Sequence, residues 1–212
     1  MAPAATRAIR SDGIRSREAI LRTAASFASM HGLEELSLGG LAAEVGMSKS
    51  GLYAHFGSKE ELQLATVEAA KVVFEELVLA PARAYPIGRD GLIALSDAFC
   101  EHIRDEVYPG GCFFDSTAAE LQAHPGPVRD AVNEVQRDWR LLVREHLHAA
   151  AAAGDLPADT DLDQLEFEIL AFDNLAHSLF RIERDARVID RAERAVRLRL
   201  GVAPDHRPVR SR

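Results

Sequence analysis

Apolar residues recur at intervals of three and four along most of the chain, and Gly, Pro and short polar runs interrupt the pattern. This spacing puts apolar side chains on one face of a helix, so it predicts amphipathic helices rather than strands. Helices are expected over about 17–31, 38–45, 49–56, 59–80, 92–107, 112–122, 127–153, 162–182 and 187–200. The pattern therefore predicts an all-α fold.

Two short helices near the N-terminus have the signals of a helix-turn-helix. Ser37 and Ser48 are expected to cap them, because a serine oxygen can accept a hydrogen bond from an amide in the first turn. Gly46 lies in the turn between them, where glycine permits a positive φ, and Ala42 is small enough for a close helix crossing. The segment therefore meets the requirements of that motif.

A long helix is expected directly after the helix-turn-helix. Ser58 and Glu61 form a capping box, and no helix breaker follows until Pro81. The helix could therefore extend for roughly 22 residues, or about 33 Å. A helix of this length can connect two domains.

The C-terminal helices carry more apolar surface than one small subunit can cover. Apolar residues lie on more than one face of the helix over 162–182, which Asp161 and Gln164 are expected to cap. Together with the helix over 187–200, it is expected to pack against its symmetry mates as a four-helix bundle. The sequence therefore predicts a homodimer.

Charge and composition exclude several classes of protein. The net charge is −8, but the first 64 residues hold seven basic and seven acidic residues, so the N-terminal region carries none of the negative excess. Cys100 and Cys112 are too few for a disulfide scaffold and lack the spacing of a zinc site. No segment resembles a secretory signal or the roughly 20 apolar residues that span a bilayer, so we expect a cytoplasmic protein without a membrane partner.

The segment over 37–62, SLGGLAAEVGMSKSGLYAHFGSKEEL, resembles the tetracycline-repressor (TetR) family of transcription regulators. The resemblance rests on the A-x-x-x-G turn, the G-L-Y-x-H-F segment and the following S-K-E-E-L, and it covers about 16–69. It implies a DNA-binding domain joined by a long helix to a helical domain for ligand binding and dimerisation. The alternative is a three-helix unit that binds another protein.

The second helix of the motif is expected to enter the major groove by its N-terminal end, where Lys49 is the only long donor. The residues expected to contact DNA are Ser37, Ser48, Lys49, Ser50, Gly51, Tyr53, His55 and Lys59. The resemblance places Tyr53, His55 and Lys59 along the phosphates. For His55, packing beside Phe56 is an equal alternative. Arginines of the N-terminal arm could reach a groove or flanking phosphates.

The resemblance also implies a small-molecule effector among the central helices. The expected ligand-binding residues are Phe99, Phe114, Asp115, Trp139, Phe172, Asp173, Asn174 and His177. They would place a few polar groups in an apolar interior, and Asp173 and His177, four residues apart, share one helix face. The alternatives are buried polar residues that pair within the protein or at the dimer contact, and a metal ion held with Asp115 or His124. We expect no metal and no cofactor.

These features divide the chain into a flexible Arg-rich arm over 1–15, a helix-turn-helix domain over 16–62, an effector-binding and dimerisation domain over 63–200, and a disordered tail over 201–212.

The sequence lacks the motifs that several enzyme classes require. It does not contain the two Glu-x-x-His motifs of a di-iron bundle, a phosphate loop, a Gly-x-Ser-x-Gly elbow or a His-Glu-x-x-His motif. A helical adaptor would not explain the arrangement over 48–59. We therefore expect a regulator, and most simply a repressor, that binds a palindromic operator as a homodimer and is released by a small hydrophobic molecule.

Overall fold

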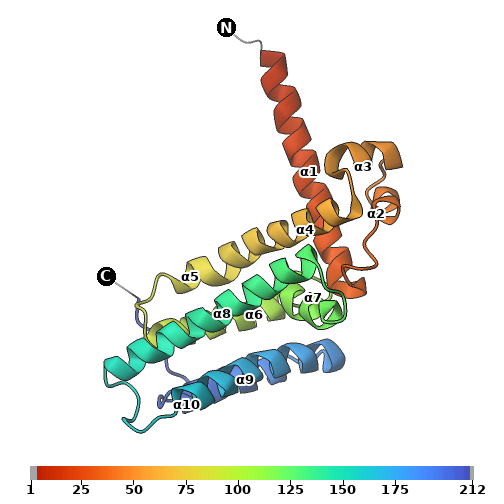
Figure 1. Ribbon diagram of the computed structural model, residues 1–212. Coiled ribbons are helices and arrows are strands. Elements are labelled where there is room, and N and C mark those ends of the chain that lie inside the picture. Colours follow the sequence, from red (N-terminus) through yellow and green to blue (C-terminus); the bar gives the residue numbers. More distant parts are fainter. Residues whose placement is uncertain (1–3, 211–212) are drawn as a thin grey trace. The chain divides into compact units, whose positions relative to one another are not determined.

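The structure is a computed structural model that describes residues 4–210, and the regular structure in this range is entirely helical (Figure 1). The elements are α1 (Ala4–His31), α2 (Leu38–Glu44), α3 (Lys49–Phe56), α4 (Lys59–Phe74), the π-helical turn η1 (Glu75–Leu79), α5 (Ala80–Ala82), α6 (Arg89–Arg104), α7 (Phe113–Leu121), α8 (Pro127–Ala152), α9 (Leu162–Glu183) and α10 (Arg187–Arg199). The predicted all-α fold is confirmed. Between residues 4 and 210, none of the helices combines the length and apolarity that a bilayer crossing requires.

The four predicted helix caps form as expected. The hydroxyl oxygens of Ser37, Ser48 and Ser58 each accept a hydrogen bond of 3.1 Å from the backbone amide three residues later. Asp161 Oδ1 accepts the equivalent bond at 3.0 Å. Because these bonds satisfy amides that have no partner inside the helix, they fix where α2, α3, α4 and α9 begin.

The long helix predicted after Ser58 is present as α4, η1 and α5, which follow one another without a break from Lys59 to Ala82. Its π-helical turn was not predicted, since it depends on backbone hydrogen bonds that side-chain spacing does not specify. The helix ends one residue after Pro81, as the proline indicated.

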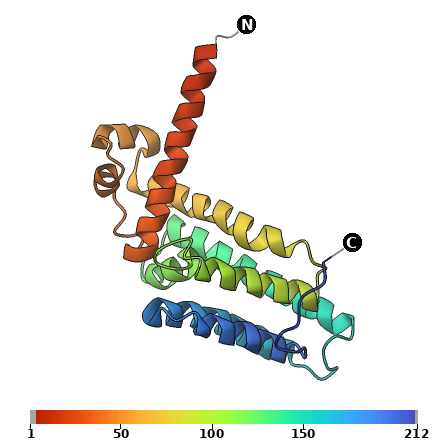
Figure 2. The same ribbon diagram turned by 180° about the vertical axis from the view of Figure 1, so that it is seen from behind.

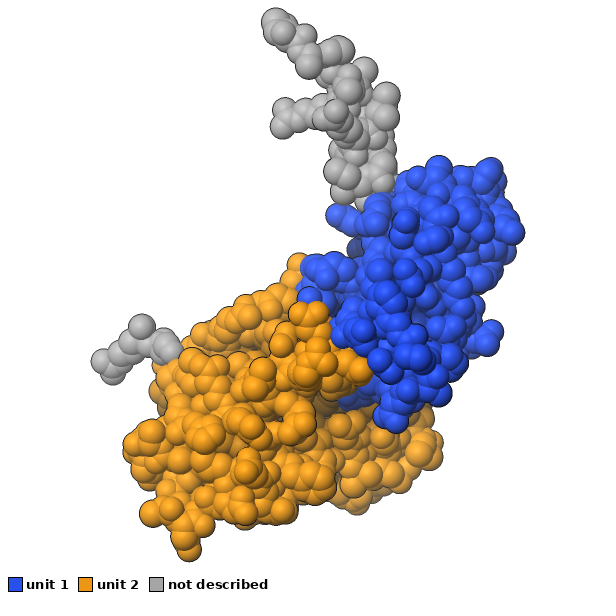
Figure 3. Space-filling view, in the orientation of Figure 1, with its two compact units in different colours: residues 1–72, 108–132 blue, residues 73–107, 133–212 orange. Residues whose placement is uncertain are grey.

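The chain forms two compact units, shown in different colours in Figure 3. Unit 1 comprises the residues up to 72 together with 108–132, and unit 2 comprises 73–107 and 133–212. The segment over 108–132, which includes α7, thus groups with the helix-turn-helix, although the sequence places it inside the expected effector domain. The functional boundaries at residues 62 and 200 stay a prediction.

Unit 1 has a small apolar core beneath the helix-turn-helix. In it α1 packs against α2 and α7, and α2 packs against α3. Ala24, Leu41, Ala42, Leu52 and Phe56 are buried at these contacts. The core fixes α2 and α3 by their apolar faces, so their polar faces remain exposed.

The backbone over 4–15, which we expected to form a flexible arm, instead forms the first turns of α1. Alanines and arginines favour helix, and no proline lies between residues 4 and 31 to end it. Residues 1–3 and the side chains before residue 17 lie outside the described part of the chain. The DNA contacts expected for those arginines therefore stay a prediction.

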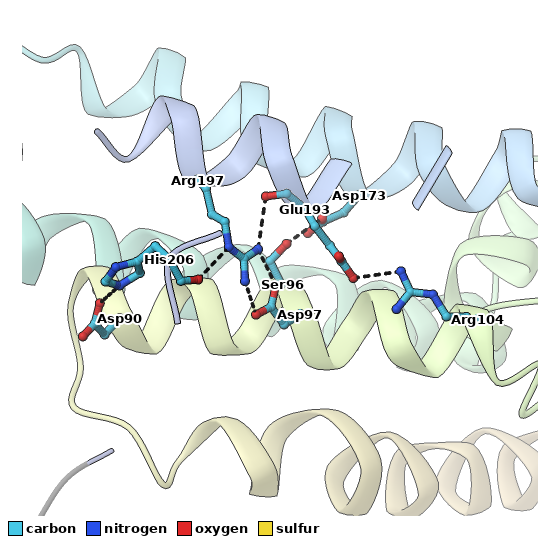
Figure 4. A network of polar contacts seen from close by, with 8 residues as sticks. All are labelled: Asp90, Ser96, Asp97, Arg104, Asp173, Glu193, Arg197 and His206. Carbon is cyan, nitrogen blue, oxygen red and sulfur yellow. Dashed lines mark hydrogen bonds and ion pairs between the residues drawn. The ribbon is translucent and has the colours of Figure 1, made fainter. Parts of the chain in front are cut away.

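In unit 2, α10 lies beside both α9 and α6, as the views in Figures 1 and 2 agree. The C-terminal segment also packs on this unit (Figure 4): His206 Nε2 lies 2.9 Å from Asp90 Oδ1, and the Val209 amide donates to Asp90 Oδ2 at 3.1 Å. Arg197 Nε donates to the His206 carbonyl at 3.0 Å. The expected disorder is therefore wrong for 201–210, because side chains distant in sequence hold the segment; the last two residues lie outside the described range.

Candidate functional site

The N-terminal end of α3 presents polar side chains to solvent. Ser48, Lys49 and Ser50 are all exposed, and the Ser48 and Ser50 hydroxyl oxygens lie 3.2 Å apart. Leu52, directly behind them, is fully buried and anchors the helix to unit 1. Donors at an exposed helix N-terminus match the hydrogen-bond acceptors of base edges and phosphates.

Lys49 does not extend freely into solvent. Its Nζ lies 5.9 Å from the centroid of the Tyr53 ring, which is 45% exposed, so the cation and the ring interact along the outer face of α3. Five of the eight predicted DNA-binding residues lie in or next to the first turns of α3, and of these Lys49 and Tyr53, four residues apart, share one face. The five are Ser48, Lys49, Ser50, Gly51 and Tyr53.

The three other predicted DNA-binding residues lie elsewhere in unit 1. Ser37 caps α2, and the His55 ring is half-buried with its centroid 6.0 Å from that of Phe56, which is the packing alternative. Lys59 Nζ forms an ion pair with Glu34 Oε2 at 3.2 Å and donates to the Glu34 carbonyl at 2.5 Å. Sequence reasoning missed this Glu34 pairing, since the residues are separated by the whole motif.

Unit 2 contains a cluster of aromatic rings. The Trp139 centroid lies 5.5 Å from those of Phe74 and Phe99, and Phe74 also meets His102 edge-on at 5.9 Å. Phe99 and Trp139 were predicted for this region, whereas Phe74 and His102 were missed. His102 could have been found, because it lies one helical turn after Phe99.

Polar groups lie close to this cluster. Asp173 and His177 are both buried on α9, as predicted, and Asp173 Oδ1 accepts a hydrogen bond of 3.0 Å from the Ser96 hydroxyl. Burial lowers the pKa of His102 to about 4, and the neighbouring His177 contributes to that shift. His102 is therefore neutral at pH 7, so this region carries fewer charges than its residue types suggest.

The remaining predicted ligand-binding residues lie on α7 and α9. Phe114 and Asp115 belong to α7 in unit 1, and Phe172 is half-buried on α9. Asn174 is exposed, so its expected interior position is wrong. The reason is helical geometry: Asp173 faces the interior, and the next residue is rotated by about 100° to the outer face.

Large apolar side chains remain exposed on the two C-terminal helices. Phe167, Leu175 and Ile182 of α9 are 66%, 57% and 78% exposed, and Leu198 of α10 is 57% exposed. The sequence predicted this surplus of apolar surface on the helix over 162–182. Such a face favours burial against another helix pair.

Two further observations concern metal binding and the reactivity of Cys100. Among the described residues, no group of three or more His, Cys, Asp or Glu side chains has the arrangement of a metal site. Burial raises the pKa of the Cys100 thiol well above its usual value, so this cysteine is not a thiolate nucleophile.

Two family models match the chain. One, described as bacterial regulatory proteins of the tetR family, matches residues 20–66. The other, described as a tetracyclin repressor-like C-terminal domain, matches residues 88–196. No curated protein matches the sequence.

Solved structures share the fold. A TetR transcriptional regulator from Chloroflexus aurantiacus J-10-FL is 27% identical with a TM-score of 0.79, over 88% of this chain and 94% of that chain. A TetR-family regulator from Cytophaga hutchinsonii is 19% identical with a TM-score of 0.75, over 89% and 95%. AibR, in complex with isovaleryl coenzyme A and operator DNA, is 22% identical with a TM-score of 0.71, over 89% and 98%. From these matches and the helix-turn-helix itself, the chain belongs to the TetR family of transcription regulators, which are DNA-binding proteins and not enzymes.

Proposed function

We propose that this regulator is a repressor that binds a palindromic operator as a homodimer and is released by a small hydrophobic molecule. The observation that carries the proposal is the exposed N-terminal end of α3, where Ser48 and Ser50 flank Lys49, the single long donor. Lys49 would contact a base edge, and Lys59 would leave Glu34 to contact a phosphate.

Dimerisation would use the exposed apolar face of α9 and α10. Phe167, Leu175 and Ile182 recur along one side of α9, and Leu198 adds to it from α10. A two-fold dimer contains two copies of α3, which is why an inverted repeat is the expected operator.

The effector would occupy the aromatic region of unit 2. Phe99 and Trp139 would supply apolar walls, and Asp173 and His177 would bind a polar or cationic group of the ligand. The neutral state of His102 favours an uncharged or weakly polar ligand beside it. AibR, one of the similar structures, is in complex with an acyl thioester and with DNA, which supports a ligand-responsive role without specifying the ligand.

Selection of duplexes from a random library, followed by footprinting, tests DNA binding. An inverted repeat protected at both half-sites is the expected result. Failure to retain any duplex above random competitor at moderate salt would overturn the proposal and favour the protein-binding alternative.

A thermal-shift screen of small molecules, followed by operator release, tests the effector region. A releasing compound is expected to stabilise the wild-type protein and the Asp138→Ala control, whose side chain is exposed beside Trp139. It should stabilise Trp139→Ala much less. Equal stabilisation of both variants would place the ligand elsewhere.

A further inference from the structure

The loop between α1 and α2 is held by a carboxylate from α7. Glu120 Oε2 accepts a hydrogen bond from the Leu33 amide, and Glu120 Oε1 accepts one from the Glu34 amide, each at 2.8 Å. Both bonds are charge-assisted, so they are stronger than bonds between neutral groups. One side chain thus fixes two consecutive peptide units that lie 86 and 87 residues away in sequence.

The backbone around these bonds is shaped to admit the carboxylate. Gly32 has a φ of +92°, and a Cβ at this position would lie 2.5 Å from Glu120 Oε1. Gly110, just before α7, packs so closely that a Cβ there would lie 1.8 Å from the Ser29 carbonyl oxygen, and its amide donates to Ser29 Oγ at 3.1 Å. The α7 segment therefore contacts the end of α1 through specific hydrogen bonds and a close backbone approach at the two glycines, and not only through apolar packing.

The opposite side of the same loop is held by α4. Gln63 Nε2 donates to the Leu33 carbonyl at 2.6 Å, and Lys59 donates to the Glu34 carbonyl. The loop ends at Ser37, which caps α2. Its position therefore determines where α2 begins, and α3 packs on α2.

The segment that carries Glu120 is joined to unit 2 at both ends. The chain passes from unit 2 to unit 1 between residues 107 and 108, and it returns between residues 132 and 133. The DNA-binding helices are thus connected to unit 2 by two routes, the continuous helix from α4 to α5 and the α7 segment.

We propose that Glu120 is a positioning residue for DNA recognition: by fixing the α1–α2 loop it sets the placement of α2 and α3, and it makes operator affinity depend on the position of α7. This inference rests on the proposed function and names a second path for its regulation. A change in unit 2 that shifts α7 by about 1 Å would stretch both bonds beyond the usual hydrogen-bond range.

The direction in which operator affinity changes when the Glu120 carboxylate is removed distinguishes a positioning role from a general effect of charge. Removing a carboxylate makes the protein less negative, which by itself strengthens binding to the DNA polyanion. The proposal requires the opposite result. In Glu120→Gln the amide oxygen can accept one of the two bonds, but its NH2 group faces the other backbone donor.

The test compares Glu120→Gln with Glu35→Gln in the complete protein, on a duplex selected with the wild type. Glu35 lies in the same loop, is exposed, and loses the same charge. Glu120→Gln is expected to bind roughly tenfold more weakly with an unchanged salt dependence, while Glu35→Gln binds equally well or more tightly. Amide exchange at Leu33 and Glu34 should accelerate roughly tenfold in Glu120→Gln, with the core of α1 unaffected.

Wild-type affinity in Glu120→Gln, or unchanged exchange at the two loop amides, would overturn the inference. Glu120→Asp keeps the charge on a shorter side chain, so a smaller loss in the same direction is expected, and the same readouts apply if Glu120→Gln does not fold. Absence of DNA binding by the wild type would instead overturn the proposed function, so the two failures are distinguishable.

Discussion

Helices α3 and α9 both expose residues that the protein's own core does not use, but the exposed chemistry is opposite. The exposed end of α3 carries Ser48, Lys49 and Ser50, whereas α9 exposes Phe167 and Ile182. Hydrogen-bond donors keep their solvation in the free protein and exchange it for acceptors on a polar partner, while apolar side chains gain by leaving water altogether. The difference matches the two partners proposed above, DNA for unit 1 and a second copy for unit 2.

Acidic residues in the exposed apolar face of α9 are expected to have the largest effect. The double variant Phe167→Asp/Ile182→Asp is expected to sediment as a monomer, because it places four carboxylates in the dimer contact. Operator affinity should fall on the order of 10²–10⁴-fold, since two linked half-site contacts become one. Ile87→Asp, an exposed aliphatic residue outside α9 and α10, is the control and should remain dimeric. A dimeric double variant with normal affinity would move the interface elsewhere.

The buried His102 in unit 2 makes the stability of the protein depend on pH. His102 has a folded-state pKa of about 4 against 6.5 in the unfolded chain, so the unfolded state takes up its proton first as the pH falls. The contribution of His102 to the free energy of unfolding is fully present above pH 6.5. As the pH falls to 4, the free energy of unfolding should decrease by about 3 kcal/mol because of this group. Urea unfolding at pH 7 and pH 4.5 should show a smaller loss for His102→Phe than for the wild type. Parallel losses in the two proteins would reject this assignment.

Lys49→Ala tests whether α3 reads base edges. Loss of one base contact should cost about 1–3 kcal/mol of binding free energy on the selected operator and relax the preference at one position of each half-site. The measurement is competitive binding against duplexes with single base changes. An unaltered preference order would mean that Lys49 contacts a phosphate and that sequence is read by other residues.

The smallest effect is expected at Lys59. Its ion pair with Glu34 is exposed and contributes little to stability, so Lys59→Ala should not disturb the fold. Because a phosphate contact carries no sequence information, the substitution should weaken binding to all duplexes to a similar extent. The slope of log affinity against log salt should become shallower by about one. Lys71→Ala, a partly exposed lysine farther along α4, should leave the slope unchanged. Altered base preference in Lys59→Ala would contradict this division of roles between Lys49 and Lys59.

Features that depend on neighbours within one or two helical turns could be predicted from the sequence. Serine and aspartate caps predicted the starts of α2, α3, α4 and α9, and the apolar periodicity predicted the helices and the surplus apolar surface of α9. The pairing of Lys49 with Tyr53, four residues apart on α3, has the same origin. Each of these features is set by the 3.6-residue repeat and by hydrogen bonds that span three or four residues.

Which distant segments meet could not be predicted, because it depends on tertiary packing. Glu120 reaches the α1–α2 loop, Asp90 holds the C-terminal segment expected to be disordered, and Phe74 joins the aromatic cluster of unit 2. The orientation of Asn174 also required it, because a helix apolar on several faces has no unique buried side until its neighbours are placed. The physical reason is that many segments could supply a matching donor, acceptor or ring, and the packing of the whole core selects among them.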